Sequence, residues 1–178
     1  MSVILETPRL ILRVFEQRDA AAMYRVFSDP VTMKYFMQWL ADSDEDVHGF
    51  IDWITGVQKE HGFSYWAMEE KATGEVIGDC GLIPLEGEGP EIELGCDVRR
   101  DLWNHGYALE ASAACLDYGF NVLKLDHIVA ATNPENKAAQ HVLEKIGMTF
   151  DHSGPYWDEE SLFYSIPNPE RASPRQIS

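Results

Sequence analysis

The segment between residues 91 and 132 limits the possible folds more than any other part of this chain. Its first stretch, "EIELGCDV" (91–98), alternates apolar and polar residues, as a half-buried strand does. A helix pattern follows, with one stripe of small and apolar residues: Ala108, Ala111, Cys115, Tyr118 and Val122. "DHIVAAT" (126–132) is then a short apolar strand. A strand, a helix and a strand in this order predict one parallel strand pair.

The segments around this unit predict an antiparallel remainder of the sheet. Strand patterns occupy 9–15, 64–70, 75–83 and 161–166, and helix patterns occupy 16–29, 43–62 and 133–147. Consecutive strand patterns are typical of hairpins. The order β-α-α-β-β-β-α-β-α-β-β therefore predicts an α+β fold, with a mixed, mostly antiparallel sheet of about seven strands and about four helices.

The length of 178 residues favours a single domain, which we place at residues 1–166. Residues 167–178 are rich in Pro, Ser, Arg and Gln, so we expect a disordered tail. The beginning of the chain carries charges that a signal peptide lacks, and no apolar run is long enough to span a membrane. Three cysteines at no metal-like spacing indicate a reducing compartment and no metal site: Cys80, Cys96 and Cys115. We expect a cytoplasmic protein.

The charge of the chain bears on its partners. Lys and Arg total 14 against 30 Asp and Glu, a formal net charge of -16. A surface this acidic repels nucleic acid, whose binding depends on cations that meet phosphates. It attracts cationic partners such as amines, although acidic surfaces also serve solubility alone.

The loop between the strand and the helix is a candidate anion site. Gly106 and Ala108 stand where the helix begins, and free backbone N–H groups and the helix dipole favour an anion there. An ordinary glycine turn has the same local sequence. "WNHGYA" (103–108) is neither a Walker loop nor a dinucleotide fingerprint.

Four motifs that occur together, in a fixed order along the chain, favour the anion site over an ordinary glycine turn. They are "LETPRLILRVFEQRDA" (5–20), "EIELGCDV" (91–98), "WNHGYALEA" (103–111) and "NPENKAAQHVLEKIGM" (133–148). Together they resemble the general N-acetyltransferase (GNAT) superfamily, and most closely the branch that contains the ribosomal-protein N-terminal acetyltransferases. The resemblance implies the GNAT fold, acetyl-coenzyme A as cosubstrate and acetyl transfer to a primary amine by direct attack.

The resemblance also assigns residues to the coenzyme. The phosphate loop and its neighbours would be Val98, Trp103, Asn104, His105, Gly106, Tyr107 and Ala108, with Asn133 and Asn136 against the pantetheine arm. Asn104 stands where the family usually has glycine. The usual proton donors to the departing thiolate are missing, because Leu143 and Ala139 occupy their places.

Glu93 is the candidate general base. It lies in the strand pattern 91–98, either as a solvated carboxylate on the wet face or as the group that takes the acceptor's proton. Gly95 in the same strand indicates a bulge or a close backbone approach. Nearby acids in the sequence, Glu86, Glu88 and Glu91, would raise the pKa of Glu93.

The acceptor is the least determined part. Met33, Tyr35, Phe36, Met37 and Trp39 could form one wall of its groove, and "GPYWDEES" (154–161) could form the other. We expect first the N-terminal α-amine of a protein or peptide. The alternatives are a small-molecule amine, such as a polyamine, amino acid or antibiotic, and a non-catalytic acyl-coenzyme A sensor. A monomer and a homodimer are both compatible with the sequence.

Overall fold

The computed structural model of the protein describes residues 2–35 and 40–171. Its strands are β1 (Val3–Glu6), β2 (Leu10–Arg13), β3 (Tyr65–Glu70), β4 (Val76–Pro84), β5 (Ile92–Val98), β6 (His127–Thr132), β7 (Thr149–Tyr156) and β8 (Glu159–Pro167). Its α-helices are α1 (Ala20–Phe27), α2 (Asp44–His61), α3 (Tyr107–Asn121) and α4 (Lys137–Lys145). Two short 3₁₀ turns, η3 (Leu85–Gly87) and η4 (Arg100–Leu102), flank β5 in the chain.

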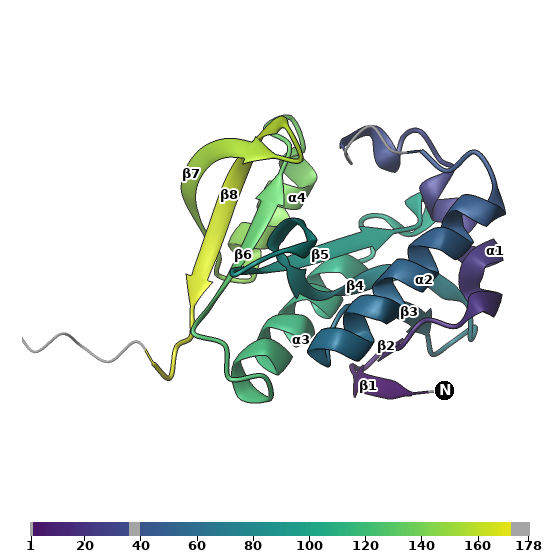
Figure 1. Ribbon diagram of the computed structural model, residues 1–178, viewed down its shortest axis with the longest axis horizontal. Coiled ribbons are helices and arrows are strands. Elements are labelled where there is room, and N and C mark those ends of the chain that lie inside the picture. Colours follow the sequence, from purple (N-terminus) through teal and green to yellow (C-terminus); the bar gives the residue numbers. More distant parts are fainter. Residues whose placement is uncertain (1, 36–39, 172–178) are drawn as a thin grey trace, which may run out of the picture.

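The strands form one sheet in the order β1-β2-β3-β4-β5-β6-β8-β7 (Figure 1). Among the strands of the described residues, only β5 and β6 run parallel, which confirms the predicted mixed, mostly antiparallel sheet. The described residues hold eight strands rather than about seven. The strand beyond the predicted order is β1, which pairs with β2 across a turn where Thr7 exchanges hydrogen bonds with Leu10. β7 corresponds to the first of the two final strands of that order, for which the sequence predicted no residue range. A four-residue edge strand is too short to show a clear periodicity in the sequence.

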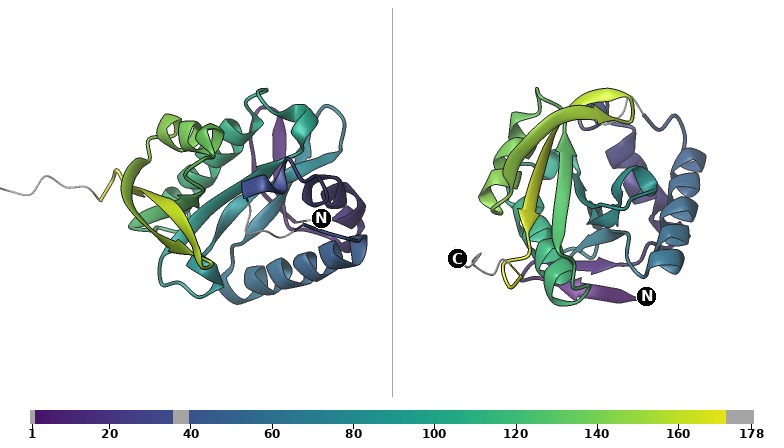
Figure 2. Two further views of the ribbon diagram at one scale, coloured as in Figure 1. Left: turned by 90° about the horizontal axis from the view of Figure 1, so that it is seen from above. Right: turned by 60° about the vertical axis from the view of Figure 1, so that its left-hand side comes forward.

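Helices cover both faces of the sheet and create two hydrophobic cores (Figure 2). On one face α3 and α4 pack over residues such as Leu82 and Leu94. On the other face α1 and α2 pack over residues such as Ala67 and Ile83. Side chains of β5 therefore alternate between two covered faces, and Glu93 does not lie on a wet face as one alternative predicted.

The strands β5 and β6 pair at a single position, Glu93 with Val129. The Arg99 N–H donates to the Ile77 carbonyl of β4, the Leu85 N–H just after β4 donates to the Glu91 carbonyl, and ladder bonds alternate along a strand. The peptide N–H groups of Cys96 and Val98 consequently face the side where β6 has diverged. This opening in the sheet is the place at which a ligand can meet unpaired backbone groups.

Gly95 was predicted to mark either a bulge or a close backbone approach, and the structure supports the close approach. The pairing of β5 with β4 runs from Ile92 to Val98 without a register shift, so the predicted bulge is wrong for this pair. A Cβ atom on Gly95 would come 2.5 Å from the Tyr65 hydroxyl oxygen. The glycine is required by close approach, because the tyrosine ring lies directly on its backbone.

The C-terminal part of the described chain packs on the domain beyond the predicted boundary at residue 166. β8 continues to Pro167, and Asn168 is buried. The Asn168 side-chain amide donates to the Leu125 carbonyl at 2.9 Å. Residues 172–178 of the predicted tail, like Phe36, Met37 and Trp39 of the predicted acceptor wall, lie outside the described residues. In the described ranges, no helix combines the length and the hydrophobicity that crossing a bilayer requires.

Candidate active site at the opening of the sheet

The loop between β5 and α3 contains two residues with left-handed backbone conformation. Gly106 caps α3 with φ +82°, and Asn104 has φ +63°. Glycine takes this conformation at no steric cost, and asparagine is one of the few other residues that tolerate it. This left-handed backbone at Asn104 explains why the family that the motifs resemble usually has glycine at this position.

The beginning of α3 presents unpaired backbone donors. Its first helical hydrogen bond runs from the Glu110 N–H to the Gly106 carbonyl, so the N–H groups of Tyr107 to Leu109 have no acceptor within the helix. The helix dipole adds partial positive charge there. Because Gly106 has no side chain, an anion can approach this backbone closely. These features fit a pyrophosphate group.

Arg9 supports the loop from β2's side of the sheet. Its guanidinium donates to the His105 carbonyl at 2.8 Å and to the Glu110 carboxylate at 2.6 Å, and it lies 4.4 Å from the centre of the Tyr107 ring. Arg9 belongs to the motif at 5–20, in which the sequence predicted no role for this residue. The structure makes it the side chain that fixes the loop against the helix.

The other predicted coenzyme residues are divided between this loop and α4. The Trp103 indole N–H donates to the Val98 carbonyl at 2.7 Å, which ties the loop to β5. His105 is exposed. Asn136 caps α4, and its side-chain oxygen accepts the Ala139 N–H of the first turn at 3.1 Å. The side-chain oxygen of Asn133 accepts the Glu135 N–H at 2.9 Å in the turn before the helix. Their contact with a coenzyme stays a prediction.

Glu93 lies beside the opening and is buried, with 2% of its surface exposed. The Tyr156 hydroxyl donates to its Oε1 atom at 2.9 Å, and the Tyr65 hydroxyl reaches the same atom at 3.4 Å. These three residues come from β5, β7 and β3. Neither tyrosine could be predicted, because nothing in the local pattern shows that positions 65 and 156 meet residue 93.

Burial raises the pKa of Glu93 to about 7, although hydrogen bonds from the Tyr156 and Tyr65 hydroxyls oppose the rise. The charge of Glu86 raises this pKa further, while a hydrogen bond from the Glu86 backbone lowers it. The predicted direction is confirmed, but its main cause is desolvation rather than neighbouring acids. A carboxylate with this pKa can take up and release a proton near neutral pH.

Two further buried acids lie on the same face of the sheet as Glu93. Asp79 on β4 and Asp97 on β5 stand directly opposite each other, and the Asp97 backbone N–H donates to Asp79 Oδ1 at 3.3 Å. Burial raises the pKa of both carboxyls, that of Asp97 to about 6, and repulsion by Asp97 raises that of Asp79 further. Neither aspartate was singled out from the sequence.

The positions of the missing proton donors are clear in the structure. Leu143 is buried in the core under α4 and has no proton to give, and Ala139 is in the first turn of that helix. Hydroxyl groups do reach the site, but they come from Tyr65 and Tyr156 and contact Glu93.

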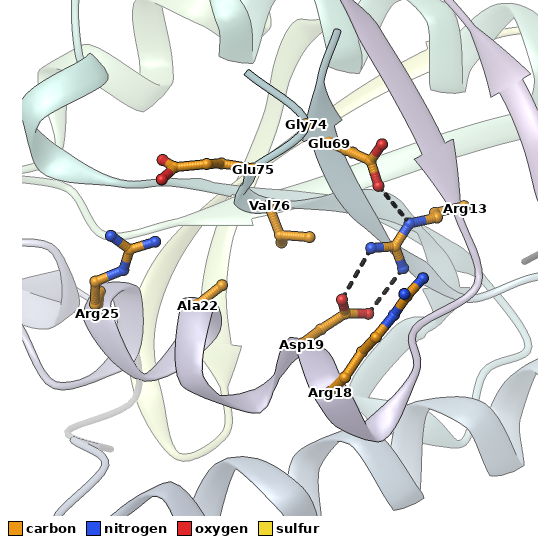
Figure 3. Close-up of a pocket in the computed structure, with 9 residues that line it drawn as sticks. All are labelled: Arg13, Arg18, Asp19, Ala22, Arg25, Glu69, Gly74, Glu75 and Val76. Atoms are coloured by element: carbon orange, nitrogen blue, oxygen red, sulfur yellow. Dashed lines mark hydrogen bonds and ion pairs between the residues drawn. The ribbon is translucent and has the colours of Figure 1, made fainter. Parts of the chain in front are cut away.

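A separate hollow of about 430 Å³ lies where α1 packs on β2, β3 and β4 (Figure 3). Its buried centre is Arg13, which donates to Asp19 at 2.8 and 2.9 Å and to Glu69 at 2.8 Å. Because the charges of Arg13, Asp19 and Glu69 are paired with one another, we interpret the hollow as a structural feature and not as a ligand site. Within the described residues, no group of three or more His, Cys, Asp or Glu side chains is arranged to hold a metal ion.

Comparison with known proteins points to one family. The sequence profile of a family described as "Acetyltransferase (GNAT) domain" matches residues 9–149. The "Uncharacterized protein YkkB" of Bacillus subtilis is 38% identical over 162 residues, which cover 90% of this chain and 93% of that protein. The crystal structure of an acetyltransferase (GNAT family) from Bacillus anthracis superposes with a TM-score of 0.79 at 29% identity, over 94% of this chain and 99% of that one.

Two more distant structures share the fold. One is a spermidine N-acetyltransferase from Vibrio cholerae in complex with CoA and spermine, with a TM-score of 0.74 at 19% identity over 91% of this chain and 97% of that one. The other is a ribosomal-protein-S5-alanine acetyltransferase from Vibrio fischeri, with a TM-score of 0.72 at 17% identity over 93% and 97%.

Proposed function

The chain belongs to the GNAT acetyltransferase family, and on that premise we propose that it moves an acetyl group from acetyl-coenzyme A to a primary amine with Glu93 as general base. One observation carries the role of Glu93. Its carboxylate is buried at the opening between β5 and β6, and its pKa lies near 7. Such a group costs free energy to bury and is poised for proton transfer at neutral pH.

Acetyl-coenzyme A would supply the acetyl thioester. The free N–H groups at the beginning of α3 and the backbone of Gly106 would hold its pyrophosphate, supported by Arg9. The unpaired N–H groups of Cys96 and Val98 would face its pantetheine arm. Asn133 and Asn136 belong to the same proposed site, at the start of α4.

Glu93 would take the proton that prevents attack. An ammonium ion has no lone pair, so the acceptor must lose a proton before its nitrogen bonds to the thioester carbonyl carbon. The carbon–sulfur bond then breaks, the coenzyme leaves as a thiolate, and the new amide nitrogen releases its second proton to solvent. A thiol of ordinary pKa near ~8.5 is a tolerable leaving group without an acid. The absence of a donor at Leu143 and Ala139 is therefore compatible with turnover.

The acceptor that we favour is an N-terminal α-amine. Its pKa near ~7.7–8.0 is close to that of Glu93, whereas a lysine side chain near ~10.4 is much harder to deprotonate. A small cationic amine is the second candidate, because the net charge of -16 attracts cations. The two distant structures named above are a ribosomal-protein-S5-alanine acetyltransferase and a spermidine N-acetyltransferase, so enzymes with this fold include one named for a protein acceptor and one named for a small amine.

The test is thiol release from acetyl-coenzyme A in the presence of peptides with free N-termini, their N-terminally blocked forms, and spermidine. Turnover with free N-termini and none with blocked peptides supports the first acceptor. Turnover with spermidine alone moves the second acceptor to first place. No thiol release with any amine, together with tight binding of acetyl-coenzyme A, contradicts the enzyme and supports a sensor.

A further inference from the structure

The connection from β4 to β5 contains a strained residue beside Glu93. Glu86, in η3, has φ +53° and ψ +22°, the left-handed conformation that costs a residue with a Cβ atom on the order of 1 kcal/mol or more. Gly87 follows with φ +77°, where glycine pays no such cost. A glutamate in this conformation calls for contacts that compensate for the strain.

Glu86 links the turn between β7 and β8 to the surroundings of Glu93. Its side-chain Oε1 accepts the backbone N–H of Trp157 at 2.7 Å. Its charge acts on the Glu93 carboxyl, whose pKa it raises. One residue therefore contacts the turn and also lies within electrostatic reach of the β5 carboxylate.

That turn carries the tyrosine which contacts Glu93. Tyr156 directly precedes Trp157, and the two residues of the turn, Trp157 and Asp158, are themselves left-handed at φ +47° and +65°. A tether on the Trp157 N–H therefore limits the movement of the neighbouring Tyr156. Without it, the 2.9 Å hydrogen bond from Tyr156 to Glu93 would depend on the hairpin alone.

We propose that Glu86 is a positioning residue, which holds the β7–β8 turn and thereby Tyr156 against the Glu93 carboxylate. The inference rests on the proposed role of Glu93. The hydrogen bond that the Glu86 carboxylate accepts from the Trp157 N–H offsets part of the strain of its left-handed backbone.

The position of η3 fits this role. A Cβ atom on Gly87 would lie 3.7 Å from Trp53 of α2, so the loop also reaches the helix on the opposite side of the site. Trp53 and Trp157 are each about half exposed. The loop thus lies between two exposed aromatic side chains at the edge of the site.

Charge and tether can be separated by substitution. The groups that face Glu93 are the Tyr65 hydroxyl from β3, the Tyr156 hydroxyl from β7 and Glu86 from η3, with Asp79 and Asp97 farther along the same sheet face. Glu86→Gln keeps an oxygen for the Trp157 N–H and removes the charge. Glu86→Ala removes both but keeps a Cβ atom, and hence the backbone strain.

Two measurements test the proposal on the full chain. ¹³C NMR titration of the Glu93 carboxyl and the ¹⁵N–¹H shift of Trp157 report the tether directly and require no turnover. Rates of thiol release against pH report its effect on the reaction. Glu88→Gln is the matched control, because it removes an equal charge from an exposed residue of the same connection.

We expect Glu86→Gln to keep the Trp157 shift, to lower the pKa of Glu93 and to retain most of kcat. We expect Glu86→Ala to move the Trp157 shift and to lower kcat roughly tenfold, the worth of a misplaced base contact, with little change in KM for acetyl-coenzyme A. Glu88→Gln should match the parent. A parental Trp157 shift and Glu93 titration in Glu86→Ala would overturn the proposal. A parent without turnover would instead count against the proposed function, while the NMR result still decides the tether.

Discussion

The Tyr156 hydroxyl donates to the Glu93 carboxylate at 2.9 Å although β7 is the third neighbour of β5 in the sheet order. The contact is possible because β5 and β6 diverge after Glu93 and the β7–β8 hairpin curves over the opening (Figure 2). The environment of the proposed base is therefore created by the divergence of the sheet and not by residues near Glu93 in sequence.

The first prediction concerns proton transfer by Glu93. Glu93→Gln keeps the shape of the side chain but cannot accept a proton, so turnover at pH 7 should fall by roughly 10²–10⁴, the usual worth of general-base catalysis. Steady-state thiol release measures this effect. Binding of acetyl-coenzyme A, followed by calorimetry, should stay close to that of the parent. Equal turnover in both proteins would remove Glu93 from the reaction.

The second prediction concerns pH. Because the pKa of Glu93 is about 7, kcat/KM should decline as pH falls below 7 and the carboxylate becomes protonated. Tyr156→Phe removes a hydrogen bond that favours the charged form, so the decline should begin at higher pH. Tyr65→Phe should act in the same direction but more weakly, because its contact is longer at 3.4 Å. A profile of Tyr156→Phe that begins its decline at lower pH contradicts this arrangement.

The sequence predicted the parts of the fold that depend on local pattern. The parallel pair β5–β6, the glycine-capped beginning of α3 and the candidate base Glu93 all follow from periodicity, glycine placement and family resemblance. The partners of Glu93 could not be predicted, because Tyr65 and Tyr156 lie 28 and 63 residues away. Pairing at such distances is decided by the register of the whole sheet.

The third prediction concerns the phosphate loop. Gly106→Val adds a side chain at the start of α3, where the Cβ atom would lie 3.4 Å from the Arg9 guanidinium, and should weaken acetyl-coenzyme A binding strongly. Gly62→Val is a matched control, because Gly62 caps α2 with the same φ of +82° and has open space around it. Both variants carry similar backbone strain of on the order of 1–2 kcal/mol. Equal loss of affinity in the two variants would indicate strain alone and contradict the phosphate site.

The fourth prediction concerns the acids at the start of α2. Asp46 accepts the backbone N–H groups of Asp42 and Ser43 at 3.0 Å and completes a capping box with Ser43. Asp46→Ala should therefore lower the free energy of unfolding by about 1 kcal/mol, measured in urea. Asp44→Ala, at an exposed position in the same turn, should cost less. An equal cost at both positions would point to the helix dipole rather than the cap.

The last prediction concerns the buried pair Asp79 and Asp97. The pKa of Asp97 is raised by burial from 3.8 to about 6, so the folded protein binds more protons than the unfolded chain between these values. Below pH 4 Asp97 is uncharged in the folded protein and does not reduce the free energy of unfolding. That free energy falls as pH rises to about 6, because the unfolded chain ionises this residue more easily. Asp97→Asn carries no charge in either state and avoids the loss.

Each unit by which the folded state raises the pKa corresponds to about 1.36 kcal/mol. The rise from 3.8 to about 6 therefore predicts that Asp97→Asn increases the free energy of unfolding by about 3 kcal/mol at pH 8. This increase should vanish near pH 2, where the aspartate is protonated in both states. Urea unfolding of parent and variant at the two pH values measures the difference, with the exposed Asp44→Asn as a control that should show no such pH dependence. If Asp97→Asn is instead less stable than the parent at pH 8, the carboxylate must have a stabilising partner in the folded state, and burial is not what raises its pKa.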